Sequence, residues 1–166
     1  MSSPQLHPSQ AAVTRSPFQA PPELAARISA AAATLLVEAG ESVFTAGSPA
    51  NGVYLLTSGT VRAYLPAEDG RELICRTLSA GSLLGLPAAM CAKVYQFTVE
   101  AVDNVMLTFV ETAVFNELLR ENTDLCMLVL GMMSDELTEI RQTHEHMRNC
   151  TNTSCSLHGA CSQHLS

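Results

Sequence analysis

Short apolar runs separated by glycines and polar turns fill the chain between residues 34 and 110. Seven of the nine glycines lie between Gly40 and Gly85, and Asp69-Gly70 is a typical hairpin turn. Runs rich in β-branched and aromatic residues, spaced by regular turn signals, are typical of a β-sandwich or barrel. The predicted strands are Leu35–Val37, Val53–Thr57, Val61–Leu65, Leu73–Leu78, Gln96–Ala101 and Val105–Val110.

The N-terminal residues have the composition of a disordered arm. Five of the eight prolines lie before residue 23, among serines and glutamines. Pro22 and Glu23 then open a predicted short helix that ends near Ala33, because the stretch is rich in alanine. We therefore expect an arm over residues 1–22 and a β domain with flanking helices over residues 23–121.

Two helices are predicted after the last strand, because no proline follows Val110. Glu111–Arg120 predicts a short helix, and residues 122–148 predict a long one. Asn122, Thr123 or Asp124 can cap the long helix.

One face of the long helix carries apolar residues at alternating spacings of four and three, which is a heptad pattern. This seam consists of Cys126, Leu130, Met133, Leu137, Ile140, His144 and Met147. A second apolar set at the helix start consists of Leu125, Leu128, Val129 and Met132. We expect the second set to pack on the β domain and the seam to form a homodimer. The alternative is one wide stripe that faces the core.

Composition excludes several classes of protein. The formal net charge is −7 and the basic residues are scattered, so a basic nucleic-acid-binding surface is not expected. No apolar run is long enough to span a membrane, and no secretory leader is evident, which favours a cytoplasmic protein. The sequence contains no nucleophile elbow, phosphate loop or zinc-protease motif, so we do not expect an enzyme.

The spacing of the glycines resembles that of a known protein family. Gly40, Gly47, the Val53–Leu56 strand, Gly59 with Val61, and Gly81 lie as they do in CRP/FNR-type bacterial regulators. The chain thus resembles the cyclic-nucleotide-binding-domain family over roughly residues 34–148. The resemblance implies an α+β fold, mainly β: an antiparallel β-roll (jelly roll), then a short helix and a long dimerisation helix. It also implies a ligand-sensing role in signal transduction.

The sequence departs from the family's phosphate-binding pattern, which is Gly-Glu-Leu followed by Arg-(Ser/Thr)-Ala. In Gly81-Ser82-Leu83, a serine stands at the glutamate position. Tyr95, Gln96 and Phe97 stand at the arginine, serine/threonine and alanine positions. Lys93 could supply a point charge, but it lacks the planar fork of arginine. Ile140 and Arg141 align with the positions that cap the base.

Loss of the arginine removes a charge-assisted contact of about 1.5–3 kcal/mol, so a cyclic nucleotide is not expected as the ligand. A less anionic or more apolar molecule is favoured. The alternative is a vestigial pocket, filled by Leu84, Leu86, Met90, Tyr95 and Phe97, in a purely structural dimerisation module. The candidate pocket consists of Gly81, Ser82, Leu83, Leu84, Lys93, Tyr95, Gln96, Phe97 and Arg141.

A cysteine- and histidine-rich tail over residues 149–166 offers a second candidate site. The spacing Cys-x2-His-x2-Cys-x2-His suits zinc, and three thiolates with one further ligand suit an iron–sulfur cluster. The candidate ligands are Cys150, Cys155, His158, Cys161 and His164. A thiol redox or disulfide role, and an incidental spacer, remain open. A metal or redox sensor is therefore the alternative to the pocket.

The three cysteines outside the tail give weaker evidence for a functional site. Cys75 and Cys126 are expected to be buried apolar residues, whereas Cys91 lies near Lys93 and is a candidate reactive thiol. Full-length relatives carry a winged helix-turn-helix after the long helix, and only 18 residues follow Arg148. We therefore expect no direct DNA binding by this chain.

Overall fold

The computed structural model describes residues 18–66, 68–70, 72–91 and 93–138. The chain divides into two compact units, Met1–Leu118 and Leu119–Ser166.

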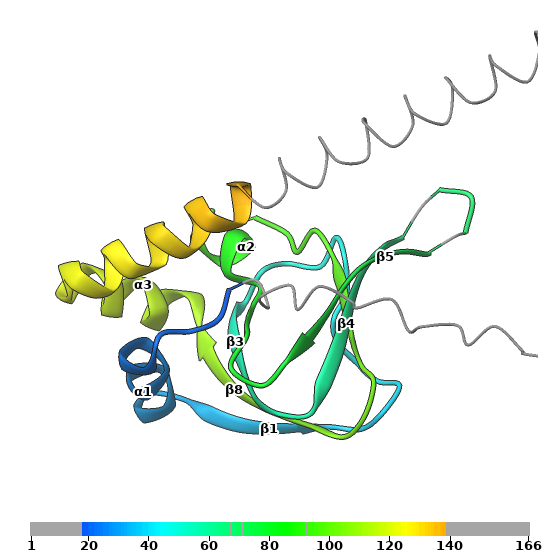
Figure 1. Ribbon diagram of the computed structural model, residues 1–166, viewed down its shortest axis with the longest axis horizontal. Helices are drawn as coiled ribbons and strands as arrows, with labels where there is room; N and C mark the ends of the chain where they lie inside the picture. The colour runs from blue at the N-terminus through cyan, green and yellow to red at the C-terminus, as the bar shows by residue number, and fades with distance from the viewer. Residues whose placement is uncertain (1–17, 67, 71, 92, 139–166) are drawn as a thin grey trace, which may run out of the picture. The chain divides into compact units, whose positions relative to one another are not determined.

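The first unit is an antiparallel β-roll made of two four-stranded sheets (Figure 1). One sheet has the order β1 (Ala33–Val37), β8 (Val105–Glu111), β3 (Gly52–Ser58) and β6 (Leu83–Leu84). The other has the order β2 (Ser42–Phe44), β7 (Thr98–Ala101), β4 (Thr60–Pro66) and β5 (Glu72–Ser79). The predicted fold class is confirmed. The sequence missed β2 and β6, because three and two residues are too few to show an alternating pattern.

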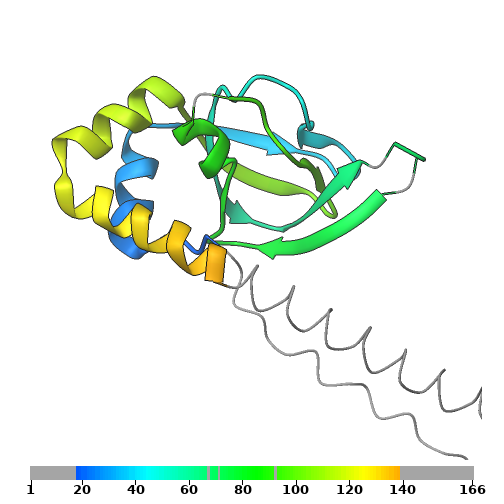
Figure 2. The ribbon, with the colours of Figure 1, turned by 90° about the horizontal axis from the view of Figure 1, so that it is seen from above.

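The core lies between the two sheets, because each strand alternates apolar side chains inward. Figure 2 shows β1 and β8 along one side of the roll, with β4 and β5 along the other. The buried core residues that touch one another are Leu56, Val61, Leu78, Leu84, Val99, Ala101, Val105 and Leu107. Ala63 and Phe44 pack against this cluster from the second sheet.

Three helices accompany the roll. In α1 (Pro22–Ala30), Leu24 and Ile28 are fully buried, and the helix packs against β8. The helix ends three residues earlier than predicted, because the chain from Ala33 pairs with β8 instead. The short helix α2 (Leu86–Met90) packs against β3, and α3 (Thr112–Glu121) follows β8.

Residues 18–20, which belong to the predicted arm, pair with the edge of β6. The Leu83 amide donates to the Phe18 carbonyl at 2.9 Å, and the Ala20 amide donates to the Gly81 carbonyl at 2.9 Å. The Gln19 side chain also donates to Ser82 Oγ at 3.4 Å. The ordered structure therefore begins before Pro22, and residues 1–17 of the arm lie outside the described residues.

In the second unit, residues 123–138 form a helix. The Asn122 side chain accepts hydrogen bonds from the amides of Asp124 (3.1 Å) and Leu125 (3.2 Å), so Asn122 is the cap. Leu125 and Val129 are buried, whereas Leu130 and Leu137 are 52% and 64% exposed. The first part of the helix therefore has one buried and one exposed apolar face. Ile140, His144 and Met147 of the seam lie outside the described residues.

Within the described part of the chain, no helix combines the length and apolar character needed to cross a membrane.

Candidate functional site

The glycine that opens α2 is Gly85, which adopts a left-handed conformation with φ +77° and ψ +7° directly before Leu86. A phosphate-binding loop uses the start of such a helix, because backbone N–H groups point outward there. From the sequence, the Gly-Glu-Leu position was expected at Gly81-Ser82-Leu83. In the structure, the glycine at a helix start is Gly85, four residues later, and Gly85-Leu86-Pro87 opens α2.

The start of α2 lacks the groups that would bind a ribose and a phosphate. Leu86 is apolar and fully buried. Pro87 has no N–H to donate. The first and last turns of α2 contain no acidic or basic residue. The start of α2 is therefore an apolar packing element.

Tyr95, at the arginine position, is only 3% exposed and its hydroxyl is fully engaged. The hydroxyl donates to the Gly52 carbonyl at 2.8 Å and accepts from the Gly52 amide at 3.2 Å. A Cβ on Gly85 would lie 2.7 Å from Tyr95 Cε1, so glycine is required there for close packing as well as for its φ. Tyr95 therefore joins β3 to the start of α2.

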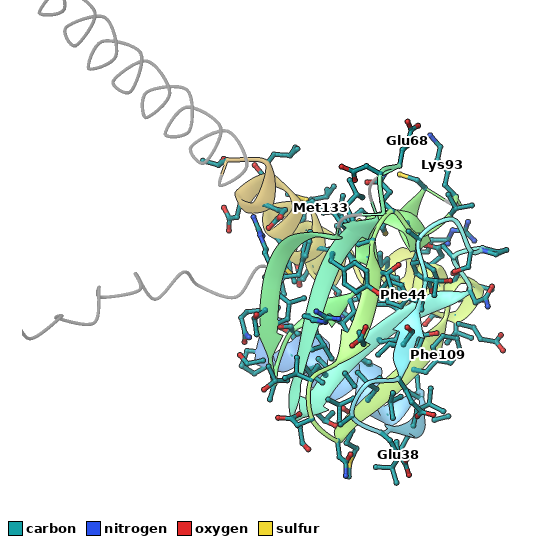
Figure 3. All side chains as sticks on the ribbon, turned by 90° about the vertical axis from the view of Figure 1, so that its right-hand side faces the viewer. Glu38, Phe44, Glu68, Lys93, Phe109 and Met133 are labelled. Carbon is teal, nitrogen blue, oxygen red and sulfur yellow. The ribbon has the colours of Figure 1, made fainter. Side chains whose placement is uncertain are left out.

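Four aromatic rings gather inside the roll around Tyr95. The Phe44 ring stacks on the Tyr95 ring at 4.0 Å and 18°. Tyr54 joins the two sheets, with its ring centroid 5.6 Å from Phe44 and 4.8 Å from Phe109. Figure 3 shows Phe44 among the strands and Phe109 nearer the edge of the roll. Burial, followed by the neighbouring phenol of Tyr95, raises the pKa of Tyr54 to about 12.

The raised pKa of Tyr54 predicts a loss of stability in alkali. The free energy of unfolding has its full Tyr54 contribution below pH 10, and loses it as the pH rises from 10.0 towards about 12. The sign follows because the folded chain keeps a proton that the unfolded chain releases. Urea denaturation across this range, with wild type and Tyr54→Phe, measures the effect. Wild type is expected to lose more stability than Tyr54→Phe, and equal losses would contradict the assignment.

Several other residues of the predicted pocket have exposed side chains. Lys93 and Gln96 are exposed, and Phe97 is 40% exposed. Figure 3 places Lys93 at the same end of the roll as Glu68, with both side chains directed outward. Arg141 lies outside the described residues. The structure therefore gives Lys93 no role as a cation on the inner face.

Arg62 also faces away from the core. Its guanidinium binds both carboxylate oxygens of Glu100 at 3.1 Å and lies 5.1 Å from the centre of the Tyr64 ring. Its neighbour Val61 is fully buried in the core, so Arg62 is on the outer face of β4. This ion pair stabilises the outer surface of the sheet.

Arg76 is a cation that the sequence pattern did not single out. It lies in β5 opposite Ala63 of β4, and it is half-buried. The neighbouring pair on the same face, Val61 and Leu78, belongs to the core. Arg76 therefore lies on the inner face of the sheet. The sequence signal for this placement is that Arg76 lies two residues before the apolar Leu78 in a predicted strand, so both side chains share a face.

The described cysteines form no cluster. Cys91 is exposed at the end of α2, Cys126 is half-buried, and neither is in a disulfide. Cys126 is thus less buried than expected. Among the described residues, no three His, Cys, Asp or Glu side chains could hold a metal ion together. The tail candidates lie outside these residues: Cys150, Cys155, His158, Cys161 and His164.

Comparison with known proteins matches residues 34–122 to the family described as the cyclic nucleotide-binding domain. The anaerobic regulatory protein of Pasteurella multocida is 27% identical over 101 residues, which cover 61% of this chain and 37% of the relative. Electron transport regulator A of Shewanella oneidensis is 26% identical over 101 residues, which cover 61% of this chain and 40% of the relative. The chain spans about two fifths of these relatives.

The fold also matches solved structures. The sensor domain of the transcriptional regulator DNR from Pseudomonas aeruginosa superposes with a TM-score of 0.60 at 25% identity, covering 66% of this chain and 74% of that one. These comparisons agree with the β-roll of the first unit.

Proposed function

The chain belongs to the cyclic nucleotide-binding domain family, and its relatives are FNR/CRP-type regulators. We propose that it is a regulatory sensor domain that binds a small molecule. Its inner site, which we place on the core-facing side of the second sheet beside Phe44, Leu65 and Phe97, binds a small molecule that is more apolar than a cyclic nucleotide. The role is regulatory, in the cytoplasm and without catalysis. The observation that carries the proposal is Tyr95, buried and bonded to Gly52 where the family pattern has arginine.

The bonding of Tyr95 disfavours a cyclic nucleotide. Its hydroxyl already satisfies both backbone groups of Gly52, and its ring is held between Phe44 and Gly85. A phosphate would lose a charge-assisted contact of about 1.5–3 kcal/mol, which weakens binding by roughly tenfold to a hundredfold.

Apolar side chains that remain exposed favour an apolar ligand. Leu65 is 38% exposed, and it follows Val61 and Ala63 at every second position of β4, so it lies on the same core-facing side. Phe97 is 40% exposed and directly precedes β7, which pairs with β4 at Tyr64. Because Thr98 is the first residue of β7 and pairs with Tyr64, Phe97 and Leu65 lie at the same end of this strand pair. Their contact with an apolar ligand would remove this surface from water.

Titration with N-phenyl-1-naphthylamine, a neutral apolar probe that fluoresces out of water, tests the proposal. We expect saturable binding to wild type. Phe97→Ser is expected to weaken it by about fivefold, because a large apolar contact is lost. Val102→Ser is the matched control, since Val102 is an exposed apolar residue (53%) in a different loop. No saturable binding to wild type, or equal weakening in both variants, would refute the proposal.

We also propose that the seam of the long helix forms a homodimer that transmits the signal. The exposure of Leu130 and Leu137 within one chain supports this, because apolar helix faces are normally covered. Leu130→Glu is expected to raise the dimer dissociation constant at least about tenfold, since it buries a charge in both copies. Thr138→Glu adds the same charge to an exposed non-seam position and should leave the constant unchanged. Sedimentation velocity measures the dimer dissociation constant. A wild-type monomer at micromolar concentration would contradict the proposal that the seam forms a homodimer.

The cysteine- and histidine-rich tail remains a prediction of metal or redox sensing. Metal and sulfide analysis of anaerobically purified protein tests it. Iron with sulfide indicates a cluster, about one zinc per chain indicates a structural site, and no metal contradicts ligation.

A further inference from the structure

We infer that Arg76 is a specificity-determining residue of the inner site, and that the ligand is an apolar molecule with one carboxylate group. This inference rests on the proposed function and names the chemical class of its ligand. In this assignment the positive charge comes from strand β5, and not from the loop that follows α2.

The register of the second sheet places Arg76 on the inner face. Val61 pairs with Leu78, and both belong to the core. Ala63 pairs with Arg76 one step further along the same face, and Ala63 packs against the core. Residues directly opposite each other in an antiparallel pair share a face. The shift in register comes only after this pair, between Ala63 and Tyr64, so it does not affect the assignment.

The other side chains on the same sheet face set the rest of the ligand chemistry. Ala63 also pairs with Val99 of β7, and Val99 pairs with Phe44 of β2. The Phe44 ring, stacked on Tyr95, thus lies on the same sheet face as Arg76. Leu65 continues this face and is partly exposed. One cation on a face that also carries aromatic and aliphatic side chains is the combination that suits an aromatic or aliphatic carboxylate.

Arg76 is suited to this role by its chemistry and its burial. It already has an interaction within the fold, but a guanidinium has five N–H donors and can bind a carboxylate through two of them. It is half-buried, so a charge pair there is less screened than one in open water. By contrast, the acidic Glu100 of the same sheet is bound by Arg62 on the outer face.

The test uses two probes of nearly equal shape, 1-naphthaleneacetate and the neutral 1-naphthaleneacetamide. Each is titrated as a competitor of N-phenyl-1-naphthylamine. Wild type is expected to bind the carboxylate about fivefold to tenfold more tightly than the amide. Arg76→Gln should abolish this preference and leave the affinity for the amide within about twofold, whereas Arg76→Lys should retain part of it. Arg27→Gln removes the same charge from an exposed position on α1 and should keep the full preference.

The outcomes separate this inference from the proposed function. Equal binding of both probes by wild type, or a preference that survives Arg76→Gln, overturns the role of Arg76 while the apolar site stands. If Arg76→Gln lowers the affinity for both probes equally, Arg76 has a structural role, and its role in specificity is overturned. If N-phenyl-1-naphthylamine itself does not bind wild type, the proposed function fails, and this inference fails with it.

Discussion

Gly52→Ala is expected to lower the free energy of unfolding by about 3–5 kcal/mol, which is a large share of the stability of a typical single domain. A Cβ at this position would lie 2.5 Å from Phe109 Cε2 and would also meet the Val110 carbonyl oxygen. The backbone of β3 would have to move, and the two hydrogen bonds between Gly52 and Tyr95 would be lost with it.

Gly131→Ala is the matched control for this variant. A Cβ on Gly131 meets nothing within 4 Å, and the residue lies within the helix of residues 123–138. Alanine there is expected to raise stability by about 0.5–1 kcal/mol. Urea denaturation followed by circular dichroism measures both changes. A Gly52→Ala variant as stable as wild type would show that the bonds between Tyr95 and Gly52 do not hold β3 to the start of α2.

Tyr95→Arg, which restores the residue of the family pattern, is expected to cost about 3–5 kcal/mol and to bring no cyclic nucleotide binding. The side chain would place a cation at a position that is 3% exposed and bonded to backbone. Tyr95→Phe keeps the ring and leaves Gly52 without a hydroxyl partner, so a smaller loss of about 1–3 kcal/mol is expected. Thermal and urea unfolding give the stabilities, and calorimetry gives the binding.

A stable Tyr95→Arg variant that binds cyclic AMP would contradict the packing role assigned to Tyr95. If the variant folds with the stability of wild type and binds cyclic AMP, then the side chain at position 95 can turn toward a ligand. Tyr95 would in that case be a ligand contact and not a packing element.

The strands were predictable because their apolar runs are long enough to show a pattern. Val53–Thr57 and Val105–Val110 lie within the observed β3 and β8. The sequence alone does not distinguish Gly81 from Gly85 as the glycine before the short helix, because both precede a leucine-rich stretch. Both have positive φ, +95° and +77°, and only the start of α2 at Leu86 separates their roles.

The chemistry of the site depends on contacts between distant parts of the chain. The sequence pattern aligned Tyr95 with the arginine position, but it carried no signal for the bonds to Gly52, which lies 43 residues away. Arg76 could be assigned to the inner face only after the register between β4 and β5 was known. A strand pattern gives the alternation of faces, whereas the pairing decides which face is buried.

Calorimetric titration of wild-type protein with cyclic AMP tests the central claim most directly. The claim is that the inner site lacks a phosphate anchor, because a buried tyrosine, Tyr95, stands where the family pattern has arginine. We expect no binding tighter than about ten micromolar. A saturable heat with a dissociation constant well below that value would contradict the claim.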